Sequence, residues 1–532
     1  MAKLLQLFKK IFGRKRQKSD SASIHELRAA FSTRYHNFKL LLTANNKALE
    51  IMSDLEKALE GNQTFGMSFV RSNSTAVLVN VFRIIKNLDE LAPGKYSELY
   101  GRFRVIQDSM NRVLTFKKMP KGDFLTLPLK SVTREMLDQV GSKMANVAEI
   151  KNEINLPVPS GFVISALAYE RFVRHNDLQA EIDRRIQAAD SDKLDDLYAL
   201  SSDIQQLIMR SSVPEDVETS ILGAYSEILT ETSPGVKVSL RSSALGEDVA
   251  GTTFAGQFRS ILNVGEDHII DAYKEVVASK YGLPAVSYRM ARGIPDEDVA
   301  MCVGCMAMVD AVAGGVMYSS NPLNIRDKSI FIDAVWGLPK AVVDGTVDPD
   351  VFVVSRNPIE VIHKDIKQKR LEFRCFPDEG VCRLEVPDDR ANLSSLTDQQ
   401  AESLALMAVK LEEYYGSPQD IEWAVSPEGS IYILQCRPLQ QVALASDATP
   451  GLDAELENET SLTRGGVTAS PGVACGPVFV VRNDVDKLKF PDGAVLVTAQ
   501  SLPRWAPLLS HAAGVVTELG GVAGHLANVA RE

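Results

Sequence analysis

The chain has 532 residues, of which 45% are hydrophobic and 24% are charged. These proportions exclude a fibrous or wholly disordered protein and predict several globular domains, at about 100–200 residues for each. The formal net charge of −11 argues against a nucleic-acid-binding protein, which would present a basic surface. Six cysteines are too few for a secreted disulfide framework in so long a chain, so we expect a cytoplasmic protein.

Residues 1–20 are predicted to form a basic amphipathic tail. The first 18 carry seven basic side chains and no acid, and the cluster Arg14-Lys15-Arg16 follows the apolar residues. A secretory signal has the opposite order and a small-residue cleavage site. Two interpretations stay open, a solvated tail or an interfacial helix that binds an anionic membrane surface at the inner membrane face.

Residues 21–122 repeat apolar side chains at intervals of three, four and seven, which predicts an antiparallel bundle of about four helices. We expect breaks at Gly61-Asn62 and at Ala92-Pro93-Gly94. The segment contains no cluster of catalytic or metal-binding side chains, so its sequence indicates no function.

Residues 123–442 alternate short β-rich runs with helical ones, which predicts an α+β body. The expected strands are 161–164, 236–241, 299–309, 315–318, 329–334, 351–355 and 431–435, and the expected helices include 192–209 and 395–415. An acidic segment with Pro450-Gly451, residues 443–462, is predicted to be a linker. Residues 463–532 then form a further domain, so the fold class is multidomain α+β.

Two groups of residues in the body suggest phosphate chemistry. A predicted strand ends in Arg241 beside hydroxyl side chains, and the loop after it contains Gly251 and Gly256. An arginine fork and flexible backbone amides are suited to hold a phosphate chain.

The second group lies in two predicted strands near the end of the body. Alternation along a strand places Asp420 and Glu422 on one face, and likewise Gln435 and Arg437. Two carboxylates beside an arginine are what a magnesium–polyphosphate site requires.

Eight motifs of the body occur together and in order. They are Val140-Gly-Ser-Lys-Met-Ala-Asn-Val-Ala-Glu149, Leu156-Pro-Val-Pro-Ser-Gly-Phe162, Leu240-Arg-Ser-Ser-Ala244, Phe254-Ala-Gly-Gln257, Gly315-Val-Met-Tyr-Ser-Ser-Asn-Pro322, Ala334-Val-Trp-Gly-Leu338, Asp420-Ile-Glu-Trp423 and Gln435-Cys-Arg-Pro438. With them, residues 124–442 resemble the nucleotide-binding domain of phosphoenolpyruvate (PEP) synthase and pyruvate phosphate dikinase, an ATP-grasp fold. Ser142 and Lys340 depart from the pattern, which usually has a glycine and an acid there.

The resemblance implies a role for each matching side chain. Lys143 and Arg241 would hold and polarise the phosphates of ATP. Glu422, with help from Asp420, would bind Mg2+. The residues implied to line the transferring phosphates are Gln435 and Arg437.

The C-terminal segment has a histidine in a suitable place for a phosphoryl group. A predicted strand is followed by Gly520-Gly521 and then by a helix with His525 in its first turn, where free amides favour an anion. Residues 469–531 resemble the swivelling phosphohistidine domain of the same family, although Gly524, Leu526 and Asn528 replace its usual residues. The resemblance implies that His525 carries the phosphoryl group and that the domain continues past Glu532.

The sequence therefore predicts an ATP-dependent phosphotransferase that moves a phosphoryl group from Mg-ATP to His525 and then to an unidentified acceptor. Pyruvate or another small molecule would be the acceptor. Two alternatives stay open: a nucleotide-binding regulatory or membrane-associated protein without turnover, and a dikinase that acts on a drug or a glucan.

Overall fold

The computed structural model describes most of the chain. The described residues are 20–60, 67–114, 123–189, 194–232, 235–247, 258–292, 296, 299–324, 326–376, 379–439, 465–487, 489–509, 511–522 and 524–531. Among them, no helix combines the length and the apolar character that crossing a bilayer needs.

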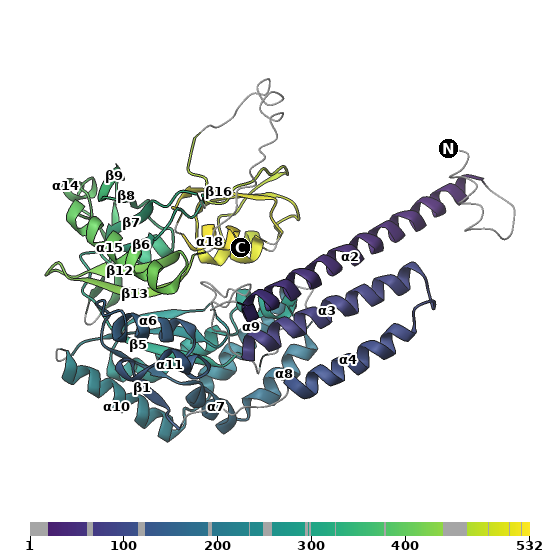
Figure 1. The fold of residues 1–532 in the computed structure, drawn as a ribbon, viewed down its shortest axis with the longest axis horizontal. Helices are drawn as coiled ribbons and strands as arrows, with labels where there is room; N and C mark the ends of the chain where they lie inside the picture. The colour runs from purple at the N-terminus through teal and green to yellow at the C-terminus, as the bar shows by residue number, and fades with distance from the viewer. Residues whose placement is uncertain are drawn as a thin grey trace. The chain divides into compact units, whose positions relative to one another are not determined.

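The chain divides into two compact units, and the first, Met1–Gln63 with Asn73–Lys117, is helical over its described residues. Its described helices are α2 (Asp20–Glu60), α3 (Met67–Leu91) and α4 (Glu98–Leu114) (Figure 1). The prediction of a fourth helix was wrong over the described residues, because α2 is one helix of 41 residues. No glycine or proline lies between its first apolar run, Leu27–Leu42, and its second, Leu49–Leu59, so nothing ends the helix there.

The second unit, Thr64–Ser72 with Lys118–Glu532, mixes helices and sheets, as predicted for an α+β protein (Figure 1). Its first sheet is antiparallel, with the strand order β1-β2-β5-β3-β4. The strands are β1 (Thr126–Pro128), β2 (Gly161–Ile164), β3 (Val238–Ala244), β4 (Ser260–Val264) and β5 (Met301–Ala307). The helices of this region are α5 (Leu137–Val140), α6 (Ser142–Asn152), α7 (Ala166–His175), α8 (Leu178–Ala188), α9 (Leu194–Arg210), α10 (Glu215–Glu231), α11 (Ile269–Ser279) and α12 (Leu283–Arg292). The strands predicted at 161–164, 236–241 and 299–309 are confirmed as β2, β3 and β5.

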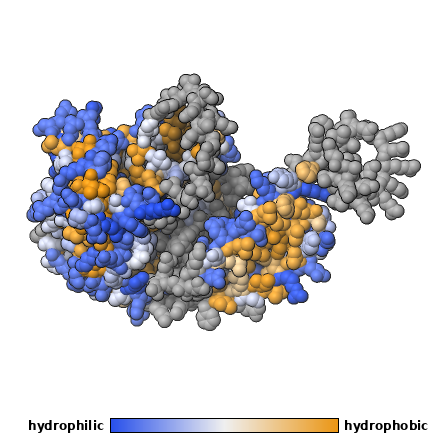
Figure 2. Space-filling model, turned by 45° about the horizontal axis from the view of Figure 1, so that its top comes forward, coloured by the Kyte–Doolittle hydropathy of each residue, from blue (hydrophilic) through white to orange (hydrophobic). Residues whose placement is uncertain are grey.

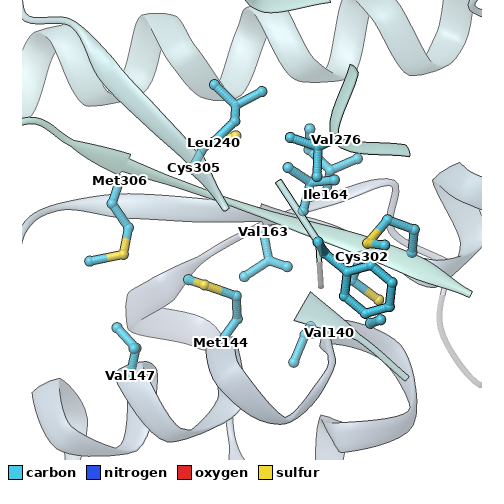
Figure 3. Close-up of a cluster of buried hydrophobic side chains, with 14 of the residues drawn as sticks. Val140, Met144, Val147, Val163, Ile164, Leu240, Val276, Cys302, Cys305 and Met306 are labelled. Carbon is cyan, nitrogen blue, oxygen red and sulfur yellow. The ribbon is translucent and has the colours of Figure 1, made fainter. Parts of the chain in front are cut away.

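The core between α6 and the first sheet is closely packed. Figure 3 shows Met144 and Val147 of α6 pointing toward the strands that carry Val163 and Met306. A Cβ atom on Gly304 of β5 would lie 2.0 Å from the sulfur of Met144. The Met144 side chain therefore fills the space that a side chain at position 304 would take. The packing therefore fixes the helix on which the predicted phosphate-binding lysine lies.

The second sheet is also antiparallel, with the strand order β13-β12-β6-β7-β8-β9. The strands are β6 (Ala313–Tyr318), β7 (Ile330–Trp336), β8 (Asp350–Arg356), β9 (Ile359–Asp365), β12 (Gln419–Val425) and β13 (Ile431–Pro438). The hairpin of β10 (Leu371–Phe376) and β11 (Gly380–Glu385) and the helices α13 (Lys340–Val343), α14 (Asp388–Ala391) and α15 (Asp398–Tyr415) complete this part. One hydrophobic cluster contains side chains from both sheets, so the two sheets share a core.

The C-terminal part has a parallel sheet with the strand order β14-β15-β16. Its elements are β14 (Val478–Val480), α17 (Asp484–Lys487), β15 (Val495–Gln500), the 3-10 helix η5 (Pro503–Leu508), β16 (Gly514–Leu519) and α18 (His525–Arg531). Trp505, Leu508 and Leu526 belong to a separate small core, which ties α18 to this sheet. The predicted linker, 443–462, lies outside the described residues.

A buried ion network joins α12 to the residue that follows α11. Arg289 Nη1 and Lys280 Nζ lie 2.6 and 3.2 Å from one carboxylate oxygen of Asp296, and all three side chains are at most 4% exposed. Tyr281 and Gln179 donate hydrogen bonds to the other oxygen. Burial alone would raise the pKa of Asp296, but the two cations and these hydrogen bonds lower it to about 2.

We expect Asp296→Asn to destabilise the fold by about 3–5 kcal/mol, because it leaves Lys280 and Arg289 buried without a counter-charge. The folded pKa of Asp296 lies below the unfolded value of about 3.9. The carboxylate's contribution to the free energy of unfolding is therefore present above pH ~4 and is lost as the pH falls toward 2. Urea unfolding at several pH values measures both effects. The control is Asp216→Asn, which breaks the exposed pair with Arg171 and should cost about 0–1 kcal/mol. Equal losses in the two variants would contradict the prediction.

Candidate functional site

The described residues of the second unit enclose a cavity of about 780 Å³. This is within the range of about 300–1,000 Å³ that small-molecule sites usually have. Six of the eight predicted site residues line it: Lys143, Arg241, Asp420, Glu422, Gln435 and Arg437. The chain positions are up to 294 residues apart, so the fold brings together what the sequence separates.

The hairpin of β12 and β13 supplies four of these side chains. Asp420 is paired across the strands with Arg437, and Glu422 with Gln435. The alternation that the sequence predicted is confirmed, because all four line the same cavity. Pairing of β12 with β6 on its other side fixes the strand in the sheet.

Both predicted metal-binding carboxylates are held by arginines. Arg241 Nη2 donates to Glu422 Oε2 at 3.0 Å, and its Nη1 donates to the carbonyl oxygen of Leu434 at 3.0 Å. Arg437 donates from Nε and Nη2 to Asp420 Oδ2 at 2.9 and 2.8 Å. Burial raises the pKa of Asp420, against the opposing effect of Arg437. The site is therefore charge-compensated and would have to exchange partners to take up a cation or a phosphate.

Lys143 lies in the first turn of α6, and Gly141 determines where that helix begins. Gly141 has φ +76°, and a Cβ atom there would lie 2.0 Å from the carbonyl oxygen of Ser243 in β3. The lysine Nζ is 2.5 Å from Glu247 Oε1, and the backbone N–H of Ala244 donates to Glu247 Oε2 at 3.0 Å. The glycine therefore lets the start of α6 lie directly against the end of the arginine-bearing strand.

We expect Gly141→Ala to destabilise the fold by about 1–3 kcal/mol more than Gly429→Ala, because only the first forces a backbone contact. Both glycines have positive φ, +76° and +84°, and Gly429 has open space where a Cβ would go. The comparison of the two variants by chemical unfolding therefore isolates the contact from the backbone strain. Equal destabilisation of the two would contradict this account of Gly141.

Sequence reasoning missed the acidic partners of the site. Glu247, fully buried, pairs with Lys143, and it stands only three residues after the motif that contains Arg241. Two further pairs line the cavity: Lys340 Nζ is 2.6 Å from Asp344 Oδ2, and Arg259 Nη1 is 3.3 Å from Glu275 Oε2. Lys143 and Glu247 are far apart in the chain and leave no local pattern, whereas the spacing of Lys340 and Asp344, four residues, is a signal that the sequence does offer.

The cavity also has an apolar wall, which the sequence did not predict as part of the site. The end of β5 and the residues after it contribute Met306, Met308 and Val309, and the other members are Leu262 of β4 and Leu434 of β13. An elongated ligand with an apolar ring at one end and negative charge at the other matches a cavity with these two regions.

The two remaining predicted residues are described only in part. Gly256 lies in the segment 248–257, outside the described residues. His525 begins α18, but its side chain lies outside the described part of the structure. The backbone before it is described: Gly520 has φ +134°, and its N–H donates to Asp348 Oδ1 at 3.1 Å. Asn528, one turn after His525, lines the cavity, so the start of α18 lies close to it.

The carboxylates fit a hard cation. Among the described residues no group of three or more histidines, cysteines or acids could hold a metal by itself. Mg2+ is usually bound through one or two carboxylates, with substrate phosphates and water as the other ligands. Asp420 and Glu422 match that donor set.

Comparison with known proteins identifies the family. Residues 137–455 match the model of the pyruvate phosphate dikinase AMP/ATP-binding domain. The chain belongs to the PEP synthase and pyruvate phosphate dikinase family. Residues 490–532 match the mobile domain of PEP-utilising enzymes, a segment that includes β15, β16 and α18.

Named members of the PEP synthase and pyruvate phosphate dikinase family align with three quarters of the chain. Probable PEP synthases of Methanothermobacter thermautotrophicus and Archaeoglobus fulgidus are 33% and 34% identical over 74% and 76% of it. PEP synthase of Aeropyrum pernix is 32% identical over 77%. The alignments cover 56%, 53% and 54% of those proteins, so the chain spans about half the length of these relatives. A crystal structure of D-cycloserine synthetase, with a TM-score of 0.19 and 10% identity over 42% of this chain and 54% of that one, is too dissimilar to carry an argument.

Proposed function

We propose that this chain is the nucleotide-using part of an ATP-dependent phosphotransferase of the PEP synthase type. It takes a phosphoryl group from Mg-ATP onto His525 and passes it to a second substrate, pyruvate or another small molecule. The observation that carries the proposal is the convergence of Lys143, Arg241, Glu422 and Arg437 on one cavity. Family membership supports it, and in this account residues 123–442 are an ATP-grasp domain and 463–532 a swivelling domain.

The cations of the cavity would bind the phosphate chain. Arg241 and Arg437 offer planar forks for phosphate oxygens, and Lys143 adds a point charge from the start of a helix whose amides favour anions. Mg2+ bound by Glu422 and Asp420 would neutralise charge on the phosphates. Met306, Met308 and Val309 would contact the adenine ring.

The transfer step is a substitution at the β-phosphorus of ATP. The lone pair of a neutral imidazole nitrogen of His525 forms the N–P bond, and the bond from that phosphorus to the oxygen bridging the α-phosphate breaks. AMP leaves with the bridging oxygen, and the β- and γ-phosphates stay on the imidazole. Water then attacks the γ-phosphorus and releases inorganic phosphate, which leaves one phosphoryl group, the former β-phosphate, on His525 for the acceptor. The contribution of Arg241, Arg437 and Lys143 is to position and stabilise the charged oxygens throughout.

The chain mixed with an excess of Mg-ATP should form AMP in a burst of about one equivalent, because without an acceptor the modified histidine accumulates. Rapid-quench chromatography of the nucleotides measures it. A burst of ADP in place of AMP would place the attack at the γ-phosphate and contradict this form of the mechanism.

Residues 1–18 are proposed to bind anionic membrane surfaces. Their seven positive charges stand in a chain of net charge −11. We expect the full chain to sediment with vesicles that contain phosphatidylserine and to be released as salt is raised, because salt screens the attraction. A variant that starts at Ser19 should stay in the supernatant. Equal sedimentation of the two would show that the segment is not the anchor.

A further inference from the structure

Helix α2 carries a stripe of large apolar side chains that nothing in the described structure covers. Figure 2 shows hydrophobic surface gathered on one face of the helical unit. The side chains of the α2 stripe are between 43% and 63% exposed. They are Phe31, Tyr35, Phe38, Leu42, Leu49 and Met52.

The stripe repeats with the period of a coiled coil. Its successive spacings are four, three, four, seven and three residues, which is the alternation of a and d positions in a heptad. Asn45 occupies the one interior position of the series that is not apolar. A single polar residue among the a and d positions typically specifies the register of a coiled coil and the number of its helices.

The stripe is separate from the face by which α2 packs in its own unit. Ala44, Ala48 and Ile51 are 5%, 5% and 8% exposed, and none of them belongs to the heptad series. From Phe31 to Thr43, no residue with described burial is buried. This half of α2 therefore has aromatic side chains but no core of its own to bury them in.

Exposed apolar side chains on α4 do not form a comparable seam. Leu99, Ile106 and Val113 are spaced by seven, but the alternate row between them, Phe103 and Met110, packs in the hydrophobic cluster of the helical unit itself and is not exposed. A single row at intervals of seven gives no interlocking layers, whereas α2 supplies both rows.

We propose that α2 is a dimerisation helix, whose stripe pairs with the stripe of a second copy of this chain in antiparallel orientation. The three aromatic side chains, at about 200 Å² each, present about 340 Å² at their exposed fractions. With the two leucines and the methionine the stripe offers roughly 600 Å² on each copy. A standard interface takes about 800 Å² from each partner, so the helix alone supplies most of a stable contact.

The charges of α2 favour the antiparallel orientation. The half around Phe38 carries Arg34 and Lys39 and no acid between residues 31 and 42. The half around Leu49 carries Glu50, Asp54 and Glu56 among residues 45–56, against one lysine. Antiparallel pairing places the basic half of each copy beside the acidic half of the other, whereas parallel pairing places like charges together.

The first test is the mass of the full chain by sedimentation equilibrium. We expect a dimer, and we expect Phe31→Glu with Phe38→Glu to raise the dimer dissociation constant at least ~10-fold, because charges would be buried in the seam. The matched control is Val113→Glu on α4, at a side chain that is 71% exposed, which should leave the dimer intact. Phe31→Leu with Phe38→Leu should also keep the dimer. Circular dichroism shows whether α2 stays helical in each variant.

The second test is the orientation. Phe31→Cys mixed with Met52→Cys should form a cross-linked heterodimer, whereas Phe31→Cys alone should not cross-link to itself. Arg34→Glu should weaken the dimer, and Glu50→Arg in the same chain should restore it, because the register that places Phe31 opposite Met52 places Arg34 beside Glu50 of the other copy. A wild-type monomer at about 100 μM, or a dimer insensitive to the glutamate variants, would overturn the proposal and assign the stripe to another partner. Self-cross-linking of Phe31→Cys would overturn the antiparallel orientation.

Discussion

Arg241→Ala is expected to slow phosphoryl transfer from ATP by about 10²–10³-fold and to weaken the binding of Mg-ATP. The guanidinium lies 3.0 Å from Glu422 and lines the cavity, so its loss removes a fork for phosphate oxygens and leaves a carboxylate without its partner. Titration calorimetry measures the affinity, and single-turnover release of AMP measures the transfer.

Glu422→Gln tests the same pair from the other side. The amide keeps the size of the carboxylate but loses its charge, so we expect the dependence on Mg2+ to shift to higher concentration. Because Arg241 holds Glu422 in the ligand-free state, uptake of Mg2+ and of ATP should help one another. Each should lower the dissociation constant of the other by the same factor.

Arg259→Ala is the matched control for Arg241→Ala. Arg259 also lines the cavity beside an acid, Glu275, but the pair is 66% and 39% exposed, whereas the pair of Arg241 and Glu422 is 15% and 18% exposed. An exposed ion pair contributes about 0–1 kcal/mol to stability, so Arg259→Ala should change ATP affinity and the transfer rate little. Unchanged ATP affinity and unchanged transfer in both Arg241→Ala and Glu422→Gln would remove the site assignment.

Local patterns predicted the strands and the site residues that share a hairpin. Period-two alternation within β12 and β13 was enough to place Asp420 and Glu422 together, and Gln435 with Arg437. A short turn joins these strands, so their register follows from nearby sequence. A bundle of about four helices requires two helices before Gly61, but no breaker separates the two apolar runs there, and α2 is one helix.

Contacts between distant segments could not be predicted from the residues alone. The pair of Arg241 and Glu422 spans 181 positions, and its formation depends on how two sheets share one core. Glu247 reaches Lys143 only because Gly141 lets α6 start against β3. The motifs indicated which side chains belong to the site, whereas the tertiary packing determines which acid compensates each cation.

The outcome of labelling His525 separates an enzyme from a nucleotide-binding regulator. We expect label from the β-phosphate of ATP to appear on the full chain as an adduct that is stable in base and labile in acid, as a phosphoramidate is. The neutral form of an imidazole has a ring nitrogen whose lone pair is available for attack on phosphorus. The amides at the start of α18 would then stabilise the charged product.

His525→Ala should abolish the label while ATP still binds, because the substitution leaves Lys143, Arg241 and Glu422 in place. The control is His511→Ala in the same domain, a histidine that is 57% exposed and bonded to Asp492 at 2.7 Å. The His511→Ala variant should take up label at the wild-type rate. Persistent label in His525→Ala would place the phosphoryl group on another residue. A wild-type chain that binds Mg-ATP and takes up no label would instead favour the regulatory alternative, in which nucleotide binding itself is the signal.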